Sequence, residues 1–114
     1  MNNILAYYYS LHPDEIIHKE NNYFFNYLDS EYVFMLFERP LSDADSLYQI
    51  NKQMIKQNLL VHEIKLNNEN RILTYINNVP YVLMEIFVNK NARITLSEIS
   101  VSYTHLTLPT ILLV

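Results

Sequence analysis

The stretch that decides the fold is residues 32–55, "YVFMLFERPLSDADSLYQINKQMI", where a strand pattern gives way to a helix pattern. Residues 31–38 are mostly aromatic and apolar, which predicts a β-strand that ends at Arg39-Pro40. Beyond the proline, apolar residues recur every three or four positions, which predicts an amphipathic helix over 43–57. The sequence therefore predicts a sheet with one main helix packed on it.

Local signals support both ends of this helix. Ser42 is a suitable N-cap, and Asp43 and Asp45 stand near the positive end of the helix dipole. Asn58 can take the left-handed conformation that commonly ends a helix. The apolar stripe expected to be buried consists of Leu47, Ile50, Met54 and Ile55.

Strand patterns flank the helix on both sides. The expected strands are 16–20, 23–28 and 31–38 before the helix, and 61–66, 71–76 and 81–88 after it. The turns expected between them are Asn21-Asn22, Asp29-Ser30, "NNEN" at 67–70 and "NNVP" at 77–80. The segment 81–88, "YVLMEIFV", is almost entirely apolar and is expected to lie centrally with both faces covered. The fold class predicted is α+β, with about five antiparallel strands and one main packed helix.

The two ends of this region also carry helix signals. "NILAYYYSL" spaces Ile4, Tyr7, Tyr8 and Leu11 as on one face of a helix, which His12-Pro13 is expected to end. The sequence "TLSE" at 95–98 is a capping box and predicts the start of another helix.

Composition excludes several classes of protein. The 114 residues carry a net charge of -4, so no basic footprint indicates nucleic acid. The absence of glycine excludes glycine-rich phosphate-binding loops, and the absence of cysteine excludes disulfides and thiolate metal sites. No apolar run approaches the roughly 20 residues of a membrane-spanning helix. We therefore expect a cytoplasmic protein without nucleic-acid or membrane partners.

No set of side chains predicts a catalytic, cofactor-binding or metal-binding site. His12, His18 and His62 lack the spacing of a zinc site and are expected to be solvated histidines on loops or strand faces. The helix positions of Asp43 and Asp45 do not face each other, so capping explains them better than acid–base chemistry. Glu38-Arg39 is interpreted as a charge pair at the end of a strand.

The C-terminal segment differs from everything before it. All 20 charged residues precede residue 101. The sequence "VSYTHLTLPT" at 101–110 resembles, in one frame, the translation of a transposase-type (Nextera-type) sequencing adapter, and Ile111 to Val114 fit the constraints of the index and stop that follow. The alternative is a native β-strand. We expect residues 101–114 to be non-native, so that Ser102, Thr104 and His105 are not site candidates.

Three stretches carry a family resemblance: "ILAYYYSLHPDEI", "YVFMLFERPLSDADSLYQINKQMI" and "RILTYINNVPYVLMEIF". Together with the element order, they resemble spore coat proteins of the CotS and YutH kind, which belong with the aminoglycoside phosphotransferase-like kinases. The resemblance covers roughly residues 4–100. It implies a kinase-like N-lobe at 15–90 after an N-terminal helix and turn at 1–14, and a truncated linker or helix at 91–100. It also implies a C-lobe, missing here, as a partner, with other coat proteins as further partners and the spore coat as a possible location.

The functional pattern of the kinases is absent from this part of the chain. A working N-lobe uses a glycine-rich loop over the phosphates, a strand lysine and a helix glutamate. No lysine occurs between Lys19 and Lys52, and the segment 43–57 contains no glutamate. We therefore expect no enzymatic activity and no cofactor here, and a structural or binding role in a degenerate kinase-like protein. Two alternatives stay open: a small-molecule phosphotransferase with a divergent nucleotide site, and an unrelated α+β interaction domain.

Overall fold

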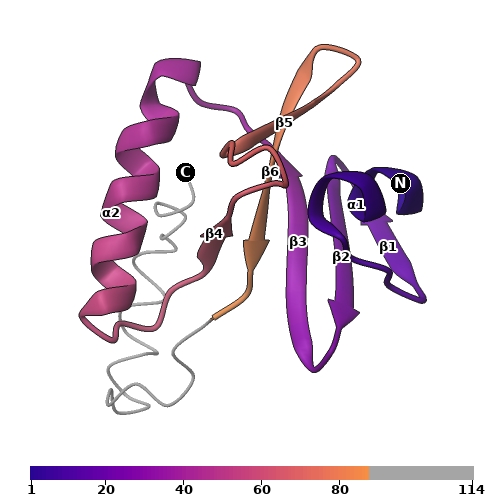
Figure 1. Ribbon diagram of the computed structural model, residues 1–114, viewed down its shortest axis with the longest axis horizontal. Coiled ribbons are helices and arrows are strands. Elements are labelled where there is room, and N and C mark those ends of the chain that lie inside the picture. The colour runs from indigo at the N-terminus through magenta and orange to yellow at the C-terminus, as the bar shows by residue number, and fades with distance from the viewer. Residues whose placement is uncertain (88–114) are drawn as a thin grey trace. The chain divides into compact units, whose positions relative to one another are not determined.

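The computed structural model describes residues 1–87, which form an α+β fold (Figure 1). These residues belong to two compact units. Among the described residues, the first contains Met1–Phe37 and Ile64–Ile86, and the second contains Glu38–Glu63 and Phe87. The expected helix at 95–98, the segment 91–100 and the tail 101–114 lie outside the described residues.

Six strands form one antiparallel sheet, which confirms the predicted fold class. Their order across the sheet is β1-β2-β3-β6-β4, and β5 also pairs with β6. The strands are β1 (Ile16–Lys19), β2 (Asn22–Tyr27), β3 (Ser30–Leu36), β4 (Glu63–Lys65), β5 (Leu73–Ile76) and β6 (Val79–Glu85). In Figure 1, β1, β2 and β3 follow one another as a meander.

Two of the predicted turns are displaced by one residue towards the N-terminus. Lys19 pairs with Asn22, so the first turn is Glu20-Asn21. Tyr27 pairs with Ser30, and the residues between them, Leu28 and Asp29, have positive φ angles of 49° and 64°. A two-residue hairpin needs a turn whose backbone twist matches that of the flanking strands. Here the pairing between the strands fixes the register, although glutamate and leucine are not preferred at positions with positive φ.

The third hairpin follows its sequence signal. Asn77 and Asn78 have φ angles of 54° and 68° and connect β5 to β6, with Ile76 opposite Val79. Asparagine tolerates the left-handed region better than most residues, so it replaces the glycine that this chain lacks.

The helix α1 (Asn2–Tyr9) covers one face of the sheet in the first unit. Its buried residue is Leu5, which packs with Phe25, Phe34 and Leu83 in the core cluster. The predicted stripe is confirmed for Ile4 and Leu11, which pack against this cluster, but it omitted Leu5 and included Tyr7, which is 70% exposed. Burying a large apolar side chain such as Leu5 stabilises the fold by about 1.5–3 kcal/mol.

The helix α1 also ends earlier than predicted. Ser10 adopts a left-handed conformation with φ 58°, and the Leu11 N–H donates to the carbonyl of Leu5. The loop between β4 and β5 completes this end, because the backbone N–H of Asn68 donates to the carbonyl of Tyr8. A distant loop, and not the following proline, therefore satisfies the last carbonyls of the helix.

The strand β6 is central, as predicted. It lies between β3 and β4 in the sheet, and its consecutive residues Val82, Leu83 and Met84 are all buried. Because successive side chains of a strand point to opposite faces, this run shows that both faces of β6 are covered. The strand ends at Glu85, earlier than the predicted end at residue 88.

In the second unit, α2 (Ala44–Lys56) follows a short 3-10 turn, η1 (Leu41–Asp43). Asp43 is the N-cap residue and makes no side-chain capping bond, so the prediction of Ser42 as the cap is wrong. Ile50 is 51% exposed, whereas the adjacent Asn51 is buried. The predicted stripe is therefore wrong at Ile50, whereas its other members, Leu47, Met54 and Ile55, are partly buried. Asn51 can be buried because it has a polar partner in its own unit.

The end of α2 follows the prediction. Asn58 has φ 61°, its N–H donates to the carbonyl of Ile55, and the N–H of Leu59 donates to the carbonyl of Met54. This pair of bonds is a Schellman motif, in which a left-handed residue lets the chain turn back on the last helical carbonyls.

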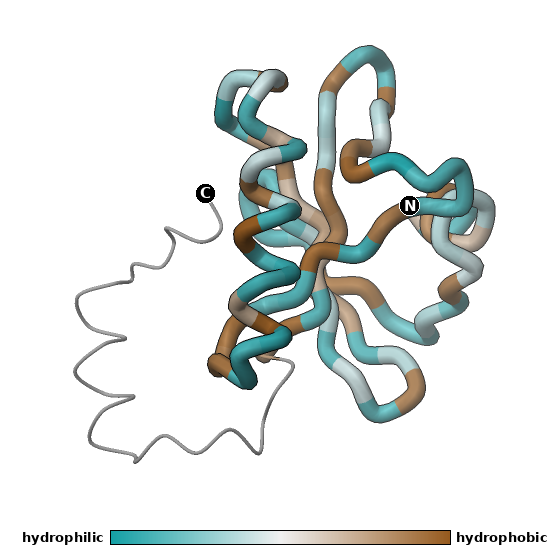
Figure 2. Tube along the Cα trace, turned by 60° about the vertical axis from the view of Figure 1, so that its left-hand side comes forward, coloured by the Kyte–Doolittle hydropathy of each residue, from teal (hydrophilic) through white to brown (hydrophobic). Residues whose placement is uncertain are grey.

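Hydrophilic and hydrophobic stretches alternate along the described chain (Figure 2). Within residues 1–87, neither helix has the length or apolar character needed to cross a membrane.

Candidate functional site

The region that the kinase resemblance designates for nucleotide binding carries different chemistry here. The turn between β1 and β2 is Glu20-Asn21, and Glu20 is an exposed residue with a φ of 61°. A carboxylate at this turn repels phosphate, while a glycine turn would offer backbone N–H groups. The strand β3 contains no lysine, and the helix α2 contains no glutamate.

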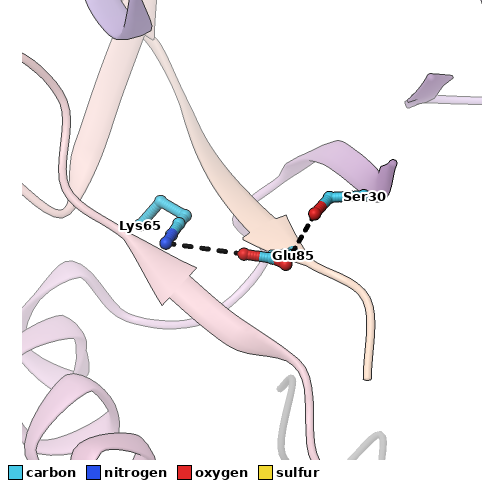
Figure 3. A network of polar contacts seen from close by, with 3 residues as sticks. All are labelled: Ser30, Lys65 and Glu85. Atoms are coloured by element: carbon cyan, nitrogen blue, oxygen red, sulfur yellow. Dashed lines mark hydrogen bonds and ion pairs between the residues drawn. The ribbon is translucent and has the colours of Figure 1, made fainter. Parts of the chain in front are cut away.

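A lysine–glutamate pair is present at another place, on the strands that follow the helix (Figure 3). Lys65 Nζ of β4 lies 3.5 Å from Glu85 Oε1 of β6. The hydroxyl of Ser30, at the start of β3, donates to Glu85 Oε2 over 3.0 Å. Both carboxylate oxygens therefore have a partner, and the Glu85 side chain is only 21% exposed.

The sequence reasoning missed this network, although one signal for it exists. Glu85 is the one charged residue in the apolar stretch "YVLMEIFV". A charge in such a strand is rarely buried without a partner. The signal therefore indicates that Glu85 is paired, but Lys65 is 20 positions away and only the pairing of the strands identifies it. The network stabilises the sheet and leaves neither carboxylate oxygen of Glu85 without a bond.

The three histidines within residues 1–87 lie in different environments. His12 is exposed, with its ring 6.4 Å from that of Tyr27, and His18 stacks on Tyr23 at 4.1 Å. Both fit the expectation of surface histidines. In the part of the chain that the structure describes, no three histidine, aspartate or glutamate side chains come together in a way that could hold a metal ion.

His62 does not fit that expectation, because it is partly buried and engaged on both sides. Its Nδ1 accepts a hydrogen bond from the Phe87 N–H at 3.0 Å, and the two rings lie 4.4 Å apart. Its carbonyl accepts a bond of 2.6 Å from Asn51 Nδ2. Burial lowers the pKa of His62 below its usual value of 6.5, which keeps Nδ1 free to accept. The prediction of a solvated His62 is therefore wrong.

The two aspartates at the start of α2, Asp43 and Asp45, have local electrostatic roles. Arg39 pairs with Asp43 over 3.6 Å, so the predicted Glu38-Arg39 pair is replaced by one with an i, i+4 spacing. Both side chains are about two-fifths exposed, and such a pair contributes at most about 1 kcal/mol. Asp45 lies in the first turn of α2, where its charge favours the helix dipole, as predicted.

A second polar network is buried in the first unit. The Tyr9 hydroxyl lies 2.7 Å from Thr74 Oγ1, which also accepts a bond of 3.0 Å from Asn67 Nδ2. Asn67 Oδ1 accepts the backbone N–H groups of Glu69 and Arg71, which closes the loop before β5. Burial raises the pKa of the Tyr9 hydroxyl to about 12, against the opposing effect of its bond to Thr74.

These groups are satisfied by one another. Within residues 1–87, every buried side-chain nitrogen or oxygen has a hydrogen-bond partner. A catalytic or ligand-binding group usually needs free bonding capacity or a strongly perturbed charge partner. Both networks connect residues of the first unit that are far apart in the sequence.

Comparisons with known proteins add no assignment. No protein-family model matches this sequence, and no curated protein is significantly similar to it.

Proposed function

We propose that residues 15–90 are a kinase-like N-lobe without catalytic function, which serves a structural or binding role as in the spore coat proteins that the sequence resembles. Support comes from the element order, in which three strands, a helix and returning strands follow one another. The last of these strands, β6, pairs with β3, so the strands on either side of the helix in the sequence belong to one sheet.

The observation that carries the proposal is the position of the lysine–glutamate pair. In a working lobe, a strand lysine bonds the phosphates and a helix glutamate holds that lysine. Here Lys65 and Glu85 connect two strands, and Ser30 occupies the remaining carboxylate oxygen. With Glu20 at the first hairpin turn, the chain offers a negative charge where phosphate would need backbone donors.

Calorimetric titration of the full chain with ATP and magnesium tests this proposal. We expect no heat of binding at micromolar to high-micromolar nucleotide. Glu20→Gln, which removes the charge from the turn, is the matched variant and should not create binding, because the strand lysine is still absent. Micromolar, magnesium-dependent binding would favour the alternative, a small-molecule phosphotransferase with a divergent nucleotide site.

We propose partners and a location on the same grounds. The partners are a kinase-like C-lobe and other coat proteins, and the location is the cytoplasm or the spore coat. A histidine-glycine-aspartate type of catalytic loop in the sequence that follows in the source gene would favour the enzyme instead. Direct sequencing of that gene from source DNA also tests the proposal that residues 101–114 are not native, which fails if the gene encodes "VSYTHLTLPT".

A further inference from the structure

The outer edge of β1 is the most exposed part of the sheet. β1 is the terminal strand in the strand order, and no described strand pairs with its outer side. Ile17, His18 and Lys19 are all exposed. A sheet edge presents unpaired backbone N–H and C=O groups and is a template for another strand.

The hairpin geometry defines which backbone groups point outwards. Because Lys19 and Asn22 flank a two-residue turn, they form a hydrogen-bonded pair, and so do Ile17 and Phe24 two positions on. Ile16 and His18 then direct their N–H and C=O groups away from β2. The edge therefore offers two backbone donors and two backbone acceptors, which belong to Ile16 and His18.

Ile17 is the exposed end of a row of apolar side chains. Through the strand register it lies beside Phe24, which lies beside Val33, which lies beside Met84. Val33 and Met84 are 5% and 2% exposed, whereas Ile17 is 59% exposed. The helix α1 packs on the opposite face of these strands, so it does not cover Ile17.

We propose that a second copy of this chain pairs with this edge, strand β1 against strand β1 in antiparallel orientation, with Ile17 opposite the partner's Ile17. In this register Ile16 lies opposite the partner's His18, and the outward groups of the two residues form four backbone hydrogen bonds across the two-fold axis. Such an interface uses the same patch on both copies and is closed, so it yields a dimer and not a fibre.

Charge selects this register among those that the backbone permits. Lys19 comes opposite the partner's Glu15, and Glu15 opposite the partner's Lys19, which gives two cross-strand pairs of opposite charge. If the register shifts by two residues in either direction, Ile17 lies opposite the partner's Glu15 or the partner's Lys19 instead. A lysine on an edge strand normally discourages pairing, but in the proposed register its charge is matched.

The interface is small, so the dimer belongs to the weak class that buries less than about 1,200 Å². It is independent of the proposed function, because no residue of the nucleotide argument takes part in it.

Sedimentation velocity of the full chain over a concentration series is the first test. We expect a reversible monomer–dimer equilibrium, which Ile17→Lys abolishes. Tyr7→Lys, at another highly exposed residue, should leave the equilibrium unchanged. Glu15→Lys and Lys19→Glu should each weaken association about tenfold or more, and the double exchange should restore it. A monomer at every concentration, or a dimer indifferent to Ile17→Lys, overturns the proposal.

A disulfide test fixes the register, since the chain has no cysteine of its own. Facing residues of a non-hydrogen-bonded antiparallel pair have Cα atoms about 4.5 Å apart, which suits a disulfide. Ile17→Cys should therefore form a covalent dimer under mild oxidation. His18→Cys is the control, because the two His18 Cα atoms would lie more than about 7 Å apart. Faster cross-linking through residue 18 than through residue 17 overturns the proposed register.

Discussion

Replacing Thr74 by valine removes one oxygen from the buried polar network while keeping the shape of the side chain. Thr74 is 1% exposed, and its Oγ1 lies within hydrogen-bond distance of both the Tyr9 hydroxyl and Asn67 Nδ2. The valine variant loses both bonds. Asn67 Nδ2 keeps a bond of 3.4 Å to the carbonyl of Leu73, which is long for a bond of this type.

The expected cost follows from these contacts. Each lost bond contributes about 0.5–1.5 kcal/mol, and a buried polar group left without its partner costs about 1–3 kcal/mol. We expect Thr74→Val to lower the free energy of unfolding by about 2–4 kcal/mol. Tyr9→Phe, which removes the hydroxyl and leaves Asn67 bonded to Thr74, should cost about 1 kcal/mol, and the double variant should cost less than the sum.

Urea denaturation followed by circular dichroism measures these differences. Thr74→Ser retains the hydroxyl and should restore most of the lost stability, while Tyr75→Phe, at the exposed neighbour, should lie within about 0.5 kcal/mol of the parent. If Thr74→Val is as stable as Tyr75→Phe, or if Tyr9→Phe and Thr74→Val are additive, the network does not tie α1 to β5 as described.

Four further outcomes are expected. Burial raises the pKa of Tyr9 to about 12 in the folded protein, from an ordinary value of 10.0, so the stability that Tyr9 contributes is fully present below pH 10 and is lost as the pH rises through 12. Tyr9→Phe should remove this loss, which amounts to about 2–3 kcal/mol, from the measured dependence of stability on pH. Burial lowers the pKa of His62, so the stability that His62 contributes is present above pH 6.5 and is lost as the pH falls through the folded pKa. His62→Gln should reduce the dependence of the unfolding free energy on pH in this range, and an unchanged dependence would count against the buried site. Leu5→Ala should cost about 2–5 kcal/mol in denaturation, and a cost below 1 kcal/mol would disprove the central place of Leu5 in the core. Asn58→Ala should destabilise by about 1 kcal/mol in thermal unfolding while Asn58→Gly does not, since glycine tolerates the left-handed φ; equal effects would contradict the Schellman motif.

The candidate site shows where sequence reasoning ends. The lack of a strand lysine and a helix glutamate follows from the order of residues alone. The Lys65–Glu85 pair and the engaged state of His62 do not, because their partners are 20 and 25 positions away. Such partners become neighbours only when the strands and loops have been placed.

The sequence by itself determined the order of strands and helices, the apolar centre of β6, and the ends of elements that a left-handed asparagine marks, as Asn58 does for α2. These features depend on preferences of residues within about one helical turn of each other. Only the tertiary structure decided that α1 ends at Ser10, that Leu5 and not Tyr7 is buried, and that Asn51 replaces Ile50 on the buried side of α2. The physical reason is that burial and polar satisfaction depend on what lies opposite. Asn68 bonds the carbonyl of Tyr7 at the end of α1 from 61 residues away, and the carbonyl of His62 gives Asn51 the acceptor that makes its burial possible.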